Sequence, residues 1–211
     1  MPETIDNRRR TLICGAACLL TLPAHAQDLL TPSQTPGPFY PDLPILDQDN
    51  DLTRIAGRDG IAEGIISELS GHLVNINGSP LAGVRIEIWQ CDHNGRYRHS
   101  RDDNSEPMDK NFQGLGHSVT DQMGRYRFRT ILPVPYPGRT PHIHAAIFRS
   151  GMKPFVTQIY IEGEPRNSND FLFQRIPSEL RPLVLAKFKP SNNEPVELAA
   201  QFNFILMDRA S

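Results

Sequence analysis

The 211-residue sequence is poor in features that would assign it at once to a class of protein. It lacks an excess of either charge, with 22 Lys and Arg residues against 24 Asp and Glu residues, and so it lacks the basic character of a nucleic-acid-binding protein. Its 22% charged and 38% hydrophobic residues are ordinary for a globular protein, which excludes disorder along the whole chain. We find no internal repeat, and the length fits one domain with a sizeable core.

Long hydrophobic runs are also scarce. The uncharged apolar run at residues 11–22 is too short to cross a bilayer comfortably, so we expect no membrane span. The run follows the arginines at 8–10 and precedes Ala24 and Ala26, in the order of charge, apolar run and cleavage site typical of an export signal. Paired arginines are typical of the twin-arginine route. The sequence predicts a leader over residues 1–26 and export to the periplasm. The alternative is an N-terminus that is apolar by chance.

Cysteine is rare, and this limits how the protein can be stabilised. Cys14 and Cys18 lie in the predicted leader, so that only Cys91 remains in the exported chain. A single cysteine cannot form an internal disulfide. The exported domain must therefore be stabilised by core packing, a metal or subunit contacts.

Proline and glycine are plentiful, at 19 and 15 residues, and they favour short strands joined by turns over long helices. Residues 27–60 are rich in Pro, Asp and Gly and are expected to form an N-terminal arm and long loop. We expect one short helix near residues 178–187. Alternating apolar residues predict strands near residues 72–76, 84–88, 126–130, 143–148, 155–161 and 196–206. The predicted fold is all-β, an antiparallel β-sandwich with long loops over residues 61–211.

The most informative chemistry is a pair of histidines, His142 and His144. Side chains two apart on a strand point to the same face, about 6–7 Å apart at the backbone, so two imidazoles can converge on one metal ion. The spacing alone is explained better by two histidines on an exposed strand. The context strengthens the metal interpretation, because the rigid loop 137–141 would hold Tyr136 and Arg139 near the same strand end.

Six short segments resemble the intradiol ring-cleaving dioxygenases, the family of protocatechuate 3,4-dioxygenase and catechol 1,2-dioxygenase. They occur in order and together cover most of residues 32–163. The segments are TPGPFY at 35–40, GVRIEIWQ at 83–90, GRYRH at 95–99, TD with GRY between 120 and 126, YPGRTPHIH at 136–144 and TQIY at 157–160.

The resemblance implies a non-haem Fe(III) held by two tyrosinates and two histidines, which here are Tyr97, Tyr136, His142 and His144. Hard anionic oxygen suits a ferric ion, and imidazole is also acceptable to iron. A free phenol has a pKa of about 10, so a tyrosinate at neutral pH needs a strong Lewis acid beside it. The set contains neither cysteine nor carboxylate, which argues against a structural zinc site and against a ferrous two-histidine, one-carboxylate site.

The resemblance also implies an activity. A catechol-type diol and O₂ would be the substrates, and both oxygen atoms would enter a cis,cis-muconate type product. Tyr136 is expected to leave the metal and take a proton from the diol, and Arg139 to stabilise negative charge on the ring. Gln158 is expected to orient the substrate, although pairing with backbone explains a strand glutamine equally well. Tyr40 and Trp89 are expected at the substrate, although a lone Trp at a strand end is more often part of a core.

The remaining candidates have plainer interpretations. We expect His99 in an exposed loop, with a supporting role behind Tyr97 as the alternative, and Cys91 as a small buried hydrophobe. His72, His93 and His117 are expected at the surface or in turns. The basic run of Arg96, Arg98 and Arg101 is expected to be solvated, or else to attract an anionic substituent of the substrate.

Two departures from the family affect function. Gly138 stands where the protocatechuate enzymes carry a bulky aromatic residue, so the identity of the substrate cannot be transferred. The chain lacks the helical N-terminal region that provides the dimer contact of the catechol 1,2-dioxygenases, and we expect it to act alone or as a homo-oligomer. The alternative function is a non-catalytic, prealbumin-like binding module, which would share the strand pattern without needing the tyrosines and histidines.

Overall fold

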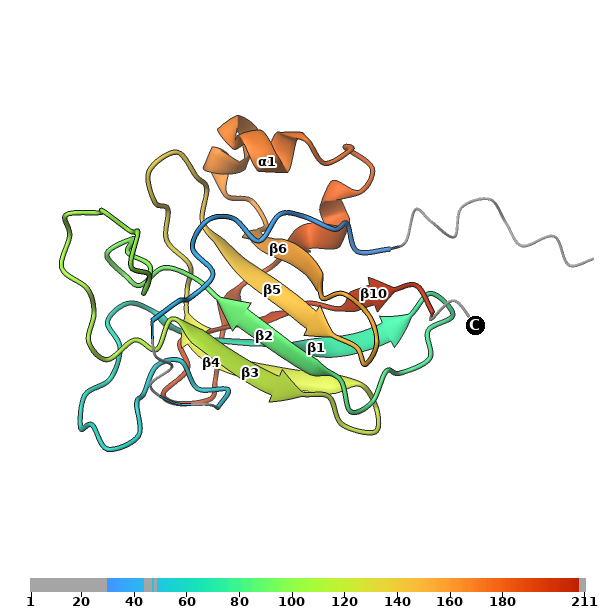
Figure 1. Ribbon diagram of the computed structural model, residues 1–211, viewed down its shortest axis with the longest axis horizontal. Coiled ribbons are helices and arrows are strands. Elements are labelled where there is room, and N and C mark those ends of the chain that lie inside the picture. The colour runs from blue at the N-terminus through green and yellow to red at the C-terminus, as the bar shows by residue number, and fades with distance from the viewer. Residues whose placement is uncertain (1–29, 44–46, 48, 209–211) are drawn as a thin grey trace, which may run out of the picture.

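The protein consists of two packed β-sheets with loops and short helices at one end (Figure 1). The structure, a computed structural model, describes residues 30–43, 47 and 49–208, and the predicted leader lies outside these residues. The first sheet contains β1 (Ile66–Asn75), β4 (Arg125–Ile131), β8 (Lys189–Pro190), β9 (Leu198–Gln201) and β10 (Phe204–Leu206). The second has the order β3 (Leu115–Val119), β2 (Arg85–Trp89), β5 (His142–Phe148), β6 (Phe155–Ile161) and β7 (Leu185–Ala186).

The main core lies between the two sheets. Alternation sends Ile143, Ala145 and Ile147 of β5 into this core, where they meet Leu69 of β1 and Phe128 of β4. Full burial of an aliphatic or aromatic side chain is worth about 1.5–3 kcal/mol, so the paired faces supply most of the driving force for the sandwich. The same alternation sends His142 and His144 to the outer face of the second sheet.

Strand register assembles a row of side chains on that outer face. His144 of β5 is the partner of Trp89 on β2 and of Gln158 on β6, and His142 is the partner of Tyr160. Directly opposed residues on neighbouring strands lie side by side on one face. Residues that are far apart in the sequence therefore lie next to each other in the fold.

Loops and the N-terminal segment cover the outer face and bury it. Residues 30–43 run across β5 and β6 (blue in Figure 1), and the Gln34 N–H donates to the Val156 carbonyl. The loop from β4 to β5 lies beside them. Beyond β6, the chain forms a 3-10 helix (Pro165–Asn169), α1 (Phe171–Gln174) and a second 3-10 helix (Arg181–Val184). Among the described residues, no helix is long and apolar enough to cross a membrane.

The prediction of an all-β, two-sheet fold is confirmed, and five of the six predicted strands overlap β1, β2, β4, β5 and β6. The strand pairs that build the sandwich are mostly antiparallel. Three pairs run parallel, namely β1 with β9, β1 with β10, and β6 with β7, so each sheet is mixed.

The predicted helix near residues 178–187 is wrong. The structure has a short 3-10 helix at Arg181–Val184, and β7 begins at Leu185. Pro177 and Pro182 limit any helix here, because proline cannot donate a backbone hydrogen bond. The chain then pairs with β6 instead of continuing a helical turn.

The predicted long strand over residues 196–206 is also wrong, because it is interrupted between β9 and β10. At the break, the Asn203 side chain accepts from the His72 N–H over 2.9 Å, in place of a backbone carbonyl. Gly71 faces the Phe202 carbonyl so closely that a Cβ at this position would collide with it. The alternation of apolar residues continues through the break, and so the sequence pattern does not reveal it.

Candidate metal centre

The two tyrosines and two histidines singled out from the sequence meet on the outer face of the second sheet. The Nε2 atoms of His142 and His144 lie 3.1 Å apart. The Tyr136 ring centroid is 5.6 Å from that of His142, and the Tyr97 ring centroid is 6.1 Å from that of His144. The two phenol rings are nearly perpendicular, 5.2 Å apart. Strand β5 and two separate loops thus bring four donor side chains to one place.

Both histidines are held as neutral imidazoles. The His142 Nδ1–H donates to the Thr140 carbonyl over 2.7 Å, which leaves the lone pair on Nε2. Burial, aided by the positive charge of Arg139, lowers the pKa of His142 to about 3. Burial also lowers the pKa of His144 well below its usual value. The two Nε2 atoms are close enough to bind one cation together, and the Nδ1 of His144 has no hydrogen-bond partner among the described residues.

Tyr97 carries an unpaired buried oxygen. Its side chain is only 1% exposed, and its hydroxyl makes no well-aligned hydrogen bond among the described residues, although the Tyr136 side chain lies within interaction range. A buried polar group without a hydrogen-bond partner lowers the free energy of unfolding by about 1–3 kcal/mol. A partner for this oxygen, such as a bound cation, would remove that cost. Burial raises the pKa of the Tyr97 phenol well above its usual value, and a cation would be needed to hold it as a phenolate.

The donor set fits a ferric ion. Two imidazole nitrogens and two phenol oxygens combine borderline and hard ligands, and the unpaired Tyr97 hydroxyl lacks a partner that a metal would supply. Nowhere in the part of the chain that the structure describes do three His, Cys, Asp or Glu side chains gather in a metal-binding group.

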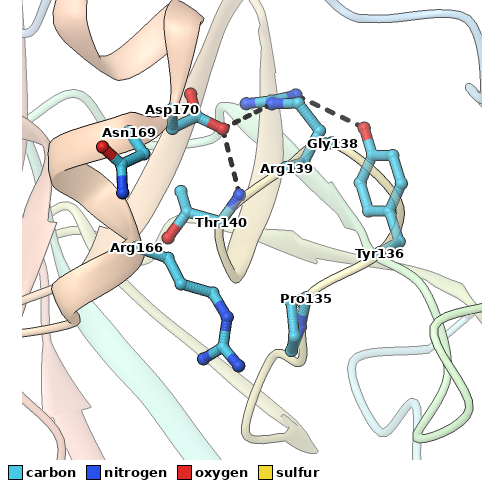
Figure 2. Close-up of a pocket in the computed structure, with 8 residues that line it drawn as sticks. All are labelled: Pro135, Tyr136, Gly138, Arg139, Thr140, Arg166, Asn169 and Asp170. Atoms are coloured by element: carbon cyan, nitrogen blue, oxygen red, sulfur yellow. Dashed lines mark hydrogen bonds and ion pairs between the residues drawn. The ribbon is translucent and has the colours of Figure 1, made fainter.

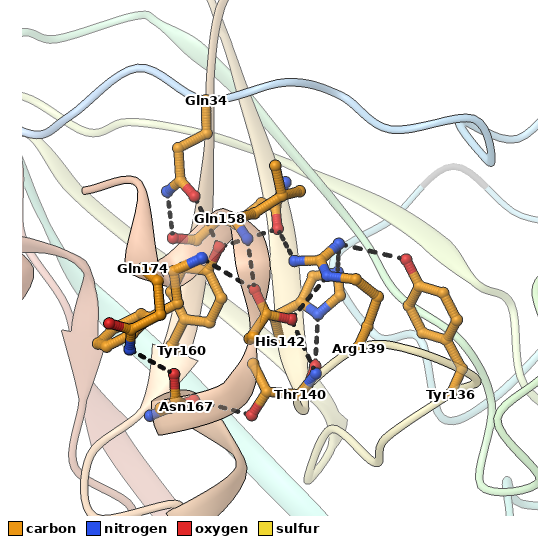
Figure 3. Close-up of polar contacts among 12 residues, drawn as sticks. Gln34, Tyr136, Arg139, Thr140, His142, Gln158, Tyr160, Asn167 and Gln174 are labelled. Carbon is orange, nitrogen blue, oxygen red and sulfur yellow. Dashed lines mark hydrogen bonds and ion pairs between the residues drawn. The ribbon is translucent and has the colours of Figure 1, made fainter.

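Arg139 lies beside this cluster and is tied to three side chains (Figure 3). Its Nε donates to Asp170 Oδ2 and its Nη2 donates to Gln158 Oε1, each over 2.7 Å. Its Nη1 donates to the Tyr136 hydroxyl over 3.3 Å. The side chain of Arg139 is only 7% exposed, so its charge acts in a site with little water.

A cavity of about 330 Å³ opens on this cluster (Figure 2). It is large enough for one substituted aromatic ring. Its lining residues are Pro135, Tyr136, Gly138, Arg139, Thr140, Arg166, Asn169 and Asp170. A second cavity of about 220 Å³ lies on another side of Tyr136 and is lined by Phe39, Gly95, Asp102, Asp103, Asn104, Tyr136 and Pro137.

A family profile described as "Dioxygenase" matches residues 35–208, which is most of the chain and includes the whole cluster. This protein belongs to the intradiol ring-cleaving dioxygenase family. The protocatechuate 3,4-dioxygenase beta chain of Burkholderia cepacia is 35% identical over 170 residues, which cover 76% of this chain and 72% of the relative. A hydroxyquinol 1,2-dioxygenase of Corynebacterium glutamicum is 30% identical over 149 residues, and this match covers 62% of this chain but only 46% of that longer protein.

Solved structures agree with this membership. The dioxygenase domain of a dioxygenase–carbohydrate-binding fusion from Streptomyces sp. SirexAA-E has a TM-score of 0.63 and 29% identity, covering 84% of this chain and 98% of that one. An intradiol ring-cleavage dioxygenase from Tetranychus urticae has a TM-score of 0.66 and 22% identity, covering 84% and 94%. The second likeness is one of fold.

In this member of the family, the two residues expected at the substrate lie at different depths. Trp89 is fully buried and stacks on His144, and it lines neither of the two cavities beside Tyr136. Tyr40 is 42% exposed, meets Trp89 edge-on at 5.0 Å, and donates its hydroxyl to Glu87 over 2.7 Å. Tyr40 is also absent from the linings of those cavities.

Gln158 pairs with the backbone, as one of its two interpretations expected, and also contacts Arg139, while its role in orienting the substrate stays a prediction. It is fully buried, its Nε2 donates to the Thr35 carbonyl over 3.0 Å, and its Oε1 accepts from Arg139. The side chain therefore links the N-terminal segment to the guanidinium beside the cluster.

The expectation that His99 lies in an exposed loop is wrong. His99 is 6% exposed, packs edge-on against Phe39, and lies 3.5 Å from the Asp42 carboxylate. The N-terminal segment folds over the loop that carries His99, and this long-range contact is invisible in the sequence pattern. Phe39 also stacks on Tyr97 at 5.1 Å, so His99 supports the ring behind the cluster, as the alternative interpretation proposed.

The other minor expectations agree only in part, because His117 is half-buried in β3 and, of the basic run, Arg101 is exposed while Arg96 and Arg98 are half-buried. His72 and His93 are exposed, and Cys91 is buried, with its thiol pKa raised to about 12 by burial. None of the three arginines Arg96, Arg98 and Arg101 lines either cavity beside Tyr136. Two of them bind backbone carbonyls instead, those of Glu106 and Pro38.

Sequence reasoning missed Asp170 and Thr140. The Thr140 carbonyl orients His142, and the Asp170 carboxylate holds Arg139. An Asp before the apolar run Phe171-Leu172-Phe173 is a recognisable helix N-cap signal, and this could have located the start of α1. Nothing in the local sequence indicates that this cap also binds an arginine 31 residues earlier.

Proposed function

We propose that this protein is a non-haem Fe(III) dioxygenase that cleaves a catechol-type diol between its two hydroxylated carbons. Both atoms of O₂ would enter a cis,cis-muconate type product. The observation that carries the proposal is the meeting of Tyr97, Tyr136, His142 and His144 beside Arg139. Membership of the intradiol family supports it.

These four residues would hold the ferric ion, with Tyr97 and the two histidines fully buried and Tyr136 at the cavity wall. The ion, when bound, supplies charge stabilisation and a template for the diol and O₂. Thr140 fixes the tautomer of His142, and Trp89 fixes the plane of His144. These contacts hold the donors in place before any substrate arrives.

Tyr136 is placed to exchange a proton with the incoming diol. It is the half-buried member of the set, and its hydroxyl oxygen accepts from Arg139 Nη1 at the edge of the larger cavity. Burial raises the pKa of Tyr136, and the positive charge of Arg139 opposes part of that rise. We propose that Tyr136, which the bound ferric ion would hold as a phenolate, would receive a diol proton at Oη and become a phenol, while the deeper Tyr97 keeps its position.

Arg139 would stabilise the negative charge that develops on the ring. A fixed guanidinium in a site that excludes water stabilises such charge far more than water does. Arg139 satisfies this condition because Gln158 and Asp170 hold it and its side chain is nearly buried.

The cavity supports a single-ring diol as the substrate. Gly138 leaves one wall without a side chain, and Arg166 and Asn169 add polar groups to the lining. We propose that ring substituents point toward this wall. Catechol, protocatechuate, hydroxyquinol and lignin-derived or plant catechols are therefore the compounds to compare.

Oxygen uptake by the iron-loaded protein, measured with each of these diols, tests the proposal. Ring-opened product would be followed in the ultraviolet. We expect a burgundy protein, from charge transfer between tyrosinate and ferric ion, and uptake with at least one diol. A colourless protein that consumes no oxygen after ferric loading would favour the binding-module alternative and contradict the proposal.

Export and assembly are separate proposals. We propose that residues 1–26 direct export to the periplasm, and the mass of the chain recovered from that compartment tests this. We also propose that the chain acts alone or as a homo-oligomer, because it carries the full set of expected ligands. Activity of the purified single chain, with its mass measured in solution, tests this.

A further inference from the structure

Asp170 connects the start of α1 to Arg139. Its Oδ1 accepts from the Leu172 N–H over 3.0 Å and from the Phe173 N–H over 2.9 Å, which caps the helix. Its Oδ2 accepts from the Thr140 N–H over 3.0 Å and from Arg139 Nε over 2.7 Å. The side chain has no exposed area. One carboxylate therefore ties the start of α1 to the loop that carries Arg139 and Thr140.

The Asp170 contact sets the direction of the guanidinium. With Nε held by Asp170, the two remaining nitrogens face Tyr136 and Gln158 (Figures 2 and 3). The Phe171 ring lies 5.7 Å from the guanidinium carbon on one side, and the Tyr136 ring lies 6.0 Å away. A planar guanidinium held at three points by hydrogen bonds has little freedom to rotate.

Charge explains why a carboxylate is needed at this place. Arg139 is almost buried beside neutral histidines and phenols, and a buried cation without a counter-ion is strongly unfavourable. Asp170 supplies that counter-ion on the side of Arg139 away from Tyr136. Without it, the guanidinium would be free to turn toward the open cavity, which Arg139 itself lines.

We propose that Asp170 is a positioning residue for ring cleavage, holding Arg139 in the orientation in which it faces Tyr136, Gln158 and the substrate. The inference rests on the proposed function, because it assigns Asp170 a part in the same reaction. Asp170 makes no hydrogen bond to the expected ligands. It lines the larger cavity, but its side chain has no exposed area, so it acts through Arg139.

Two variants separate this role from helix capping. Asp170→Asn and Asp170→Ser both keep a good N-cap oxygen for α1, since Asn and Ser cap helices about as well as Asp. Asn places an N–H₂ or a neutral oxygen opposite the Arg139 Nε–H, and Ser is too short to reach it. Both remove the counter-ion while leaving the start of α1 intact.

Asp121→Asn is the matched control. Asp121 also accepts from two backbone N–H groups, those of Met123 and Arg125, and its other oxygen accepts from the Nε of Arg125. It lies in the turn between β3 and β4, next to the end of β3 that pairs with Arg85. Trp89, which contacts the cluster, pairs with the opposite end of β3. Asp121 therefore lies at the end of this sheet that is away from the cluster.

The expected result is a lower kcat with a nearly unchanged KM for Asp170→Asn and Asp170→Ser in the iron-loaded enzyme. Misplacement of a catalytic group by about 1 Å costs up to about 10²-fold, and we expect a loss of that order. Iron content should equal that of the wild type. Crystal structures of the loaded variants should show the guanidinium turned away from Gln158. Asp121→Asn should keep the wild-type kcat.

Three results would overturn the proposal. These are a wild-type kcat in both Asp170 variants, a loss of activity that only follows loss of iron or of folded protein, and a guanidinium that stays on Gln158 in the variant crystals. Failure of the proposed function looks different, because the wild type itself would then consume no oxygen with any diol. The position of Arg139 in the variant crystals would still decide whether Asp170 orients it.

Discussion

The imidazole of His144 lies flat against the indole of Trp89, with ring centroids 4.7 Å apart and planes within 5°. Strand register produces this contact, because the two residues are partners on β5 and β2. Gly37 lies near the Cε1 edge of the same ring, because a Cβ added there would be 3.4 Å from His144 Cε1. The indole of Trp89 therefore holds the plane of the His144 ring.

We expect Trp89→Leu to weaken iron binding more than Trp89→Phe. Both variants leave space behind His144 and lose on the order of 2 kcal/mol of unfolding free energy. Phenylalanine keeps an aromatic face against the imidazole, whereas leucine does not. The rate of iron loss to a chelator, measured below the unfolding temperature, should be faster for Trp89→Leu. Equal rates in the two variants would show that stacking does not hold the ligand.

Removing single hydroxyls should separate the roles of the tyrosines. Tyr97→Phe should abolish iron binding and colour, because it removes a buried oxygen that nothing else in its surroundings replaces. Tyr136→Phe should retain some iron with an altered absorption spectrum. Iron content and the visible spectrum are the measurements.

Tyr126→Phe is the control for these variants. The hydroxyl of Tyr126, on β4 of the first sheet, is buried but donates to the carbonyl of Phe202, which lies between β9 and β10 of the same sheet. Its loss should cost about 1 kcal/mol of stability and leave iron and colour unchanged. Full iron and full activity in Tyr97→Phe would show that the ligand set is wrong.

The sequence predicted the local features of this fold because they are set by neighbouring residues. Alternation placed His142 and His144 on one face of a strand, and turn residues located most strand ends. The break at Asn203 was missed because a side-chain oxygen replaces a backbone acceptor without disturbing the apolar pattern. The four-residue helix α1 is too short to show a helical period.

The candidate site required information beyond local pattern. Tyr97 and Tyr136 lie on loops, where spacing gives no direction. The rigid loop 137–141 placed Tyr136 near the histidines, but only the family resemblance identified the two tyrosines as ligands. The position of Asp170 beside Arg139 depends on a contact between residues 31 apart in the sequence, and the burial of His99 depends on one between residues 57 apart. Such contacts are set by the packing of the whole chain, and no property of the local sequence reports them.

Gly138 should control which ring substituents are accepted. It has φ +80°, and the space around a Cβ there is free of atoms within 4 Å, on the wall of the larger cavity. Gly138→Phe should narrow the cavity and raise KM for substituted diols more than for catechol itself. Gly83→Phe is the control. Gly83 has φ +68° and open space around a Cβ, so a side chain there should cause similar backbone strain. Gly83 is not part of the lining of either cavity beside Tyr136. Equal KM changes in both variants would contradict this prediction.

Gln158→Leu should lower kcat by roughly tenfold, because loss of its oxygen frees one nitrogen of Arg139. Gln90→Leu is the comparison, since Gln90 is equally buried and pairs with Ile131 and Thr130 on β4. Each variant leaves buried polar groups without hydrogen-bond partners, and each such group lowers the free energy of unfolding by about 1–3 kcal/mol. The unfolding temperature should therefore fall by a similar amount in both variants. Steady-state kinetics should distinguish them, and an equal fall in kcat would indicate a purely structural role for Gln158.

Turnover of a diol under ¹⁸O₂ by the iron-loaded protein tests the central claim most directly. Mass spectrometry of the ring-opened product should find both labelled oxygen atoms in one molecule of a cis,cis-muconate type diacid. A product that carries a single labelled atom, or that is cleaved outside the two hydroxylated carbons, would contradict the account.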